Sequence, residues 1–157
     1  MKWLNKNHKR SKKMLHSYTK IWLHVIWSVK NRKRIISPEK AIVIRKHIIE
    51  YANKEGIKLE SINIQPEHMH TSIELPSDMC VKDIVKKLKG ESSHYINSTN
   101  LFKFKFNWQR GYGAFSFGAS QLEVVKNYIS NQTNHHRKQN FNTEWNMLLE
   151  KYGLIGH

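Results

Sequence analysis

Two histidines separated by a single residue, His68 and His70, are the first candidates for chemistry in this sequence. Polar and apolar residues alternate strictly from His68 to Leu75, which predicts a β-strand with both imidazoles on one face. Two imidazoles side by side suit one divalent metal ion. A His-x-His pair by itself is a weak signal, because histidines are common on the exposed faces of strands.

Tyr128 and Gln132 are the second candidate pair. The sequence predicts a helix over about 120–138, opened by a capping-box pattern at Ser120–Glu123. Its apolar positions recur at helical spacing and form one stripe: Leu122, Val125 and Ile129. Tyr128 and Gln132 are four residues apart, so they lie on one line along the margin of that stripe. A tyrosine there can reach past its own core, although a core-edge tyrosine with a solvated glutamine gives the same pattern.

Phosphodiester chemistry fits these two pairs of residues. Attack by a tyrosine hydroxyl on a phosphodiester forms a phosphotyrosine and expels a 3′-hydroxyl, and the covalent link preserves the bond energy for rejoining without ATP. The chain has no Gly-x-x-x-x-Gly-Lys-Ser/Thr loop, so we expect no nucleotide cofactor. Gln132 could add an oxygen ligand to the two imidazoles, and such a site suits Mg²⁺ or Mn²⁺ once a phosphodiester completes it.

The chain is strongly basic, with 27 Lys and Arg against 12 Asp and Glu among 157 residues, a net charge of +15 and a pI near 10.0. This excess predicts a nucleic-acid partner, with a merely soluble basic protein as the alternative. The length fits one domain at 18–157, preceded by a basic arm at 1–17. The lone Cys80 indicates a reducing compartment, and no segment resembles a signal peptide or membrane span, so we expect a cytoplasmic protein without membrane contact.

The periodicities of the chain predict an α+β fold. The expected strands are Thr19–Val29, Ile57–Ile64 with a bulge at Ser61, His68–Leu75, and a strand–turn–strand over Asn107–Phe117; the expected helices are Ser37–Gly56, Val81–Asn97, the tyrosine helix and Thr143–Tyr152. This order is the split βαβ of ferredoxin-like and RRM-like domains, with an extra strand and two added helices on an antiparallel sheet. Met69 and Ile73 would face the two inner helices, which leaves His68 and His70 on the open face for the tyrosine helix to cover.

Several basic side chains are candidates for phosphate contacts. They are Lys82, Lys86 and Lys89 on the polar face of one helix, Lys30 and Arg32 in the loop after the first strand, and Arg110 before the last strand. A solvated helix face explains the three lysines equally well.

The chain also resembles a known family. His68-Met69-His70 looks like the histidine–hydrophobic–histidine (HUH) motif, and Tyr-x-x-x-Gln on a downstream helix is similar to the single-tyrosine HUH transposases of the insertion-sequence 200/605 type. Three further pieces agree in order and spacing over about 18–153: His24–Arg32, Leu88–Ser93 and Trp108–Tyr112. The resemblance implies that Tyr128 is the nucleophile and that His68, His70 and Gln132 are the metal ligands.

The same resemblance implies the substrate and the assembly. The family acts as a homodimer on single-stranded DNA, which it cuts and rejoins at transposon ends marked by hairpins, in bacteria or archaea and at the nucleoid. We expect dimer pairing through the edge strand near Phe115 and Phe117, where unpaired backbone groups would otherwise face water. Tyr128 could serve its own subunit or the other one. The basic arm is longer than expected for the family and has no assigned role.

Other functions remain possible on this sequence. Relaxases and replication initiators share the HUH motif, but in relaxases the tyrosine precedes the histidines. A domesticated single-stranded nucleic-acid-binding module on an RRM-like fold would need neither a metal nor a reactive tyrosine. A two-histidine phosphoesterase needs two His-x-Ser/Thr copies, and only His70-Thr71-Ser72 is present.

Overall fold

A four-stranded antiparallel sheet in the order β2-β3-β1-β4 forms the centre of the computed structural model, which describes residues 17–136 and 139–155. The strands are β1 (Trp22–Ser28), β2 (Lys58–Ile64), β3 (His68–Glu74) and β4 (Gly113–Phe117). Every residue of β1 is buried, which confirms a central strand covered on both faces. It begins at Trp22 rather than Thr19 because the preceding residues are exposed. The predicted bulge is present as a register shift between Leu59 and Ser61.

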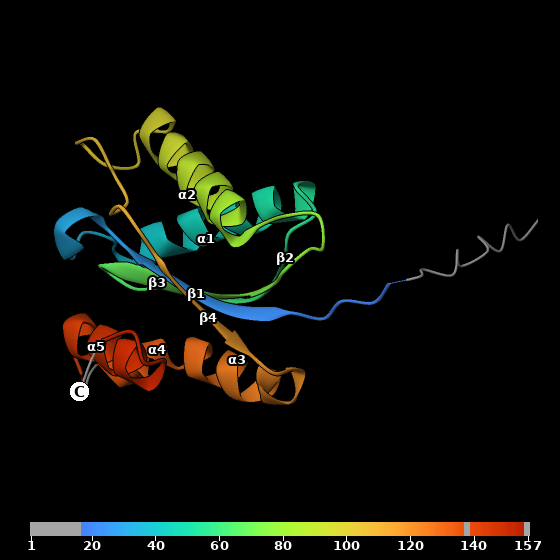
Figure 1. The fold of residues 1–157 in the computed structure, drawn as a ribbon. Coiled ribbons are helices and arrows are strands. Elements are labelled where there is room, and N and C mark those ends of the chain that lie inside the picture. The colour runs from blue at the N-terminus through green and yellow to red at the C-terminus, as the bar shows by residue number, and fades with distance from the viewer. Residues whose placement is uncertain (1–16, 137–138, 156–157) are drawn as a thin grey trace, which may run out of the picture.

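Two long helices, α1 (Pro38–Lys54) and α2 (Val81–Ser98), cover one face of this sheet (Figure 1). Ser37 caps α1 as predicted, since its hydroxyl accepts a hydrogen bond from the Lys40 amide. The main core lies between these helices and the sheet, and its most buried members include Val25, Ile44, Ile48, Met69, Ile73, Ile84 and Leu88. The helix pair and the strand order confirm the ferredoxin-like fold, with Met69 and Ile73 pointing to the helices.

The opposite face of the sheet is covered by α3 (Leu122–Ser130), α4 (Gln132–His136) and α5 (Phe141–Lys151) (Figure 1). The prediction of one continuous tyrosine helix was wrong. A 3₁₀ turn occupies Ala119–Gln121, the N-cap is Gln121 without a side-chain bond, and the helix breaks at Asn131. Ser130 and Asn131 are poor helix residues because their side chains compete for backbone hydrogen bonds. The predicted capping box at Ser120 is therefore not formed.

The segment before β4 also differs from the prediction. Only an isolated bridge between Val29 and Trp108 replaces the extra strand. The amide side chain of Asn97 bonds both the N–H and the C=O of Phe106, so these backbone groups are not available for a strand ladder.

The last helix docks on its own chain rather than standing free for a partner. Asn140 caps α5, and Phe141 packs with Ile26 and Phe115 in a second, smaller core on this face. Gly113 permits the close approach, because a Cβ there would lie 3.0 Å from the Trp145 ring. Across residues 17–136 and 139–155, no helix has the length and apolarity needed to cross a bilayer. Residues 1–16 of the predicted arm and 137–138 of the predicted tyrosine helix lie outside the described part.

Candidate metal and tyrosine site

His68 and His70 lie side by side on the face of β3 that α3, α4 and α5 cover. Both are 0% exposed, and their Nε2 atoms are 3.0 Å apart. Strand alternation produces this placement, since Met69 between them points into the main core. Two ligands at right angles around a metal with bonds of about 2.1 Å lie roughly 3 Å apart, so the spacing suits a shared ion.

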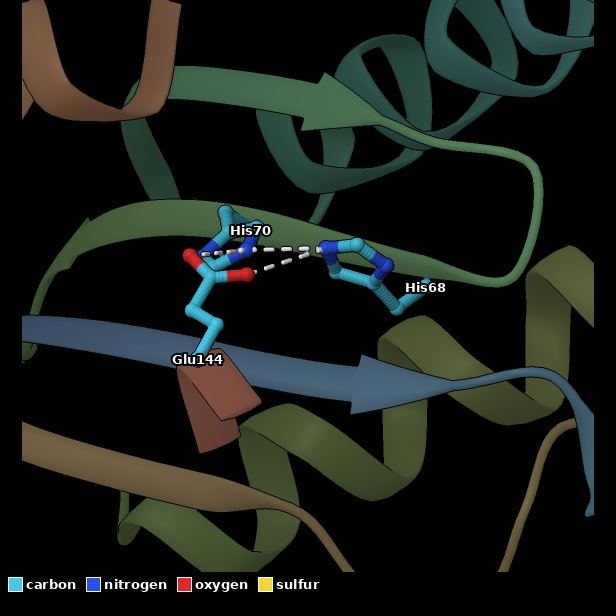
Figure 2. A group of neighbouring side chains, drawn as sticks. All are labelled: His68, His70 and Glu144. Carbon is cyan, nitrogen blue, oxygen red and sulfur yellow. Dashed lines mark hydrogen bonds and ion pairs between the residues drawn. The ribbon is translucent and has the colours of Figure 1, made fainter. Parts of the chain in front are cut away.

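Glu144 on α5 completes the cluster. Its Oε1 lies 3.4 Å from His70 Nε2 and its Oε2 lies 3.7 Å from His68 Nε2. Figure 2 shows Glu144 reaching from α5 towards the two imidazoles, with dashed lines between the three side chains. The candidate ligand atoms of all three residues lie within 4.8 Å of one another. The sequence patterns did not predict a role for Glu144. The available signal was an acidic residue at helical spacing from Phe141 and Leu148, inside an apolar stripe that buries it.

Neighbouring side chains fix which nitrogen each histidine offers to the cluster. His68 Nδ1 lies 3.4 Å from Glu67 Oε1, and the Glu67 carboxylate is in turn paired with Arg34 at 2.9 Å. His70 Nδ1 lies 2.9 Å from Nε2 of His24 on β1. When both Nδ1 atoms carry the proton, both Nε2 lone pairs point at one place, and a cation there removes their mutual repulsion.

His24 is a buried partner of the cluster to which the sequence analysis gave no role. Burial, and then the adjacent His70, lowers the pKa of the His24 imidazole to about 3. It is therefore neutral near pH 7 and can accept a hydrogen bond from His70. Hydrogen-bonded partners of this kind hold a ligating imidazole in one orientation.

Tyr128 on α3 also contacts this cluster. Its hydroxyl donates a hydrogen bond to Glu144 Oε1, and its ring lies edge-on to His24 and His70, with centroid distances of 5.8 and 6.0 Å. Burial, together with the hydrogen bond to Glu144, raises the pKa of Tyr128 above its usual value. The phenol is thus protonated in this arrangement. Tyr128, Glu144 and His24 also line a cavity of about 460 Å³ between α3 and α5.

Gln132 opens α4, one residue after the helix break, and is 0% exposed. Its Nε2 donates to the backbone carbonyl of Tyr128 at 3.4 Å, whereas its Oε1 is buried without a hydrogen-bond partner among the described residues. A buried amide oxygen without a partner is costly, and a cation would satisfy it. The two imidazoles and the carboxylate of the cluster are a donor set that fits a divalent ion.

Contacts from β2 hold the tyrosine helices on the sheet of the same chain. Lys126 of α3 forms an ion pair of 3.3 Å with Glu60, the bulged residue of β2. The side-chain amide of Asn63, also on β2, donates a hydrogen bond of 3.4 Å to the carbonyl of Ser130. Ile129, on the same helix α3, is fully buried. These contacts place Tyr128 beside the histidines of its own chain.

The predicted DNA contacts lie on two different surfaces. Lys82 and Lys86 are exposed on α2, across the sheet from the histidines. Lys89 donates to the carbonyl oxygens of Gln109 and Gly111, so its ammonium group anchors that loop. The remaining candidates, Lys30, Arg32 and Arg110, are exposed on the loops that flank α5.

Comparison with known proteins places this chain among DNA transposases. The family model described as "Transposase IS200 like" matches residues 17–132. The ISDra2 transposase TnpA of Deinococcus radiodurans is 29% identical over 114 residues, which cover 69% of this chain and 81% of that protein. The transposase of insertion sequence IS200 from Salmonella typhimurium is 23% identical over 126 residues, covering 77% and 82%.

Two solved structures share the fold. A protein of Deinococcus radiodurans R1 assigned as a transposase has a TM-score of 0.62 and 23% identity, covering 77% of this chain and 97% of that one. A REP-associated tyrosine transposase bound to a REP hairpin has a TM-score of 0.59 and 18% identity, covering 78% and 72%. The family match extends through β1–β4 and α3 and includes His68, His70, Tyr128 and Gln132, but it ends before Glu144. The chain belongs to the IS200-like family of single-tyrosine transposases.

Proposed function

We propose that this transposase cleaves and rejoins single-stranded DNA at hairpin-marked transposon ends through a 5′-phosphotyrosine at Tyr128. The observation that carries the proposal is the meeting of the Tyr128 hydroxyl with two imidazoles and a carboxylate in one buried cluster. The Tyr128 oxygen attacks the phosphorus and passes its proton to Glu144, the acceptor of its hydrogen bond. The bond from phosphorus to the 3′ oxygen breaks, and this oxygen takes up a proton and leaves as the 3′-hydroxyl. Attack by a 3′-hydroxyl on the phosphotyrosine reverses these steps and rejoins the strand.

The proposed metal site uses His68 and His70 with oxygen ligands from Gln132, Glu144 or both. When bound, Mg²⁺ or Mn²⁺ would polarise the phosphate and offset the charge that develops during transfer. His24 orients His70 through the hydrogen bond between their rings, and the Glu67 carboxylate lies against the imidazole of His68. The covering helices keep bulk water from the cluster, which strengthens every charge interaction inside it.

Substitutions of Glu144 and Gln132 show which of these two residues supplies an oxygen ligand to the metal ion. We expect Glu144→Gln, which keeps the shape but removes the charge, to weaken Mn²⁺ binding about 10-fold or more. Gln132→Ala is the matched variant, and titration calorimetry with Mn²⁺ measures both. Unchanged affinity in Glu144→Gln together with loss in Gln132→Ala would leave Glu144 as a hydrogen-bond partner of Tyr128 only.

The proposed substrate rests on charge and on the relative that is bound to a REP hairpin. We expect the affinity for hairpin DNA with a single-stranded flank to fall steeply as the salt concentration rises. Each phosphate of the single strand that the protein neutralises should contribute roughly −0.7 to the slope of log K against log salt. Deletion of residues 1–17 should flatten that slope, as measured by fluorescence anisotropy. An unchanged slope would make the arm a solubilising tail.

DNA as substrate would place the activity in the bacterial or archaeal cytoplasm, at the nucleoid.

We further propose a homodimer paired through the edge strand β4, with each chain building its own site. The contacts of Glu60 and Asn63 with α3 support a site within one chain. Mixing His70→Ala protein with Tyr128→Phe protein should then give no cleavage despite subunit exchange. Recovered cleavage would mean that the sites are shared across the dimer, and a monomer at micromolar concentration by light scattering would exclude the dimer.

A further inference from the structure

A second cavity, of about 520 Å³, opens on the other side of α5 from the Tyr128 cavity. Two loops form its rim: the 3₁₀ turn η1 (Lys30–Arg32) after β1, and the segment 109–112 before β4. We name it the loop cleft, and its lining residues are Trp27, Ser28, Asn31, Arg32, Gln109, Arg110, Gly111, Tyr112, Phe141 and Trp145. Two arginines and several aromatic rings contribute to this lining, and no acidic residue does.

The rim of the loop cleft is held in shape by hydrogen bonds. The Lys89 ammonium group donates to the carbonyl oxygens of Gln109 at 2.6 Å and Gly111 at 2.8 Å, and the Asn31 amide donates to the Gln109 side chain at 2.8 Å. Asn31 and Arg32 adopt left-handed backbone conformations, with φ of 58° and 54°. Non-glycine residues hold such conformations at a cost, and they concentrate at functional sites. A rim fixed in advance loses less entropy when it binds a ligand.

The loop cleft adjoins the metal and tyrosine site through one aromatic ring. Phe141 lines the cleft and also stacks on His68, with ring centroids 4.1 Å apart and an interplanar angle of 18°. Ser28, at the inner end of the cleft, pairs with His68 in the β1–β3 ladder. The loop cleft is therefore next to the histidine cluster, where the proposed function places the scissile phosphate.

The side chains of the loop cleft match an unpaired nucleotide. Tyr112 is 38% exposed and presents a ring on which a base can stack, whereas a base inside a duplex has no free face to offer. The guanidinium group of Arg32 already lies 5.3 Å from the Phe141 ring centroid, at the border between the charged and aromatic parts of the cleft. Arginine combines phosphate pairing with stacking on planar groups, which lysine does not.

We propose that the loop cleft binds one unpaired nucleotide of the DNA strand next to the scissile phosphate. Its base stacks on Tyr112, and its phosphate pairs with Arg32 and Arg110. This inference rests on the proposed function, because it takes the strand at the histidine cluster to be single-stranded DNA. Phe104, exposed between Lys103 and Lys105 on a separate surface, provides an aromatic control in a similar charge environment.

The test compares two probes of equal charge with the full chain: a fluorescein-labelled oligothymidine of about 20 nucleotides, and an abasic strand of the same length. We expect the parent protein to bind oligothymidine more tightly by about 5- to 100-fold, the range of one base–aromatic stack. Tyr112→Ala should remove most of that preference while binding the abasic strand as the parent does. Tyr112→Phe and Phe104→Ala should keep the preference.

A cross-linking experiment places the base directly. Oligothymidine carrying 5-iodouracil, irradiated with the parent protein, should attach to Tyr112, as located by mass spectrometry of the digested adduct. A preference for bases that persists in Tyr112→Ala, or that is lost in Phe104→Ala instead, would overturn the loop cleft as the base site. A different result would contradict the proposed function: the parent protein binds both probes but does not cleave hairpin DNA.

Discussion

Replacement of Tyr128 by phenylalanine should abolish both DNA cleavage and the covalent protein–DNA adduct. The change removes one oxygen and leaves the ring against His24 and His70, so the fold and DNA binding should be nearly unaffected. Loss of the nucleophile removes the covalent step itself, and we expect a fall in turnover of roughly 10³-fold or more. A denaturing gel with labelled hairpin DNA that carries a single-stranded flank measures the adduct and the cut strand together.

Tyr18→Phe is the matched control for that experiment, since it removes the same atom from an exposed tyrosine outside the cluster and the loop cleft. It should cleave as the parent does. Full cleavage by Tyr128→Phe would exclude Tyr128 as the nucleophile. Loss of cleavage with an equal loss of DNA affinity would instead assign the hydroxyl to substrate binding.

Replacement of His70 by alanine should remove metal binding and cleavage together. The His70 imidazole contacts three members of the cluster, namely His68, His24 and Glu144, so its loss leaves the other donors without a common centre. We expect Mn²⁺ affinity to fall at least about 10-fold, the lower range for loss of a supporting partner, and cleavage to fall to background. EDTA should have the same effect on cleavage by the parent protein.

His94→Ala is a suitable control, because His94 is exposed on α2, across the sheet from the cluster. It should bind Mn²⁺ and cleave DNA normally. Circular dichroism of His70→Ala would show whether the fold survives the cavity left by a buried imidazole. Undiminished cleavage by the parent protein in EDTA would make the histidines structural.

The periodic elements of this fold were predictable from local sequence. The alternation from His68 onwards predicts β3 and the face on which both histidines lie, and the helical spacing from Val81 onwards predicts α2 to within one residue. These patterns are reliable because each element buries one continuous set of side chains in the main core. The β-bulge near Ser61 was also predictable, because the alternation of apolar and polar residues is interrupted there.

The features that were not predicted depend on contacts between residues distant in sequence. The segment expected as an extra strand makes an isolated bridge, Val29–Trp108, and directly before it the Asn97 side chain takes up both backbone groups of Phe106. No local pattern reveals either contact. Glu144 reaches the histidines because α5 packs over the sheet through contacts such as that of Trp145 with Gly113, which are distant in sequence. The break at Asn131 moves Gln132 into a separate short helix, although its spacing from Tyr128 is unchanged.

Identification of the residue that carries the DNA tests the central claim most directly. After reaction with a hairpin oligonucleotide and nuclease trimming, trypsin should release a peptide from 127 to 137 that contains Tyr128 as its sole tyrosine. Fragmentation by mass spectrometry should locate a 5′-linked nucleotide on Tyr128 and nowhere else. A nucleotide on any other residue, or cleaved DNA with no covalent adduct at all, would contradict the phosphotyrosine mechanism.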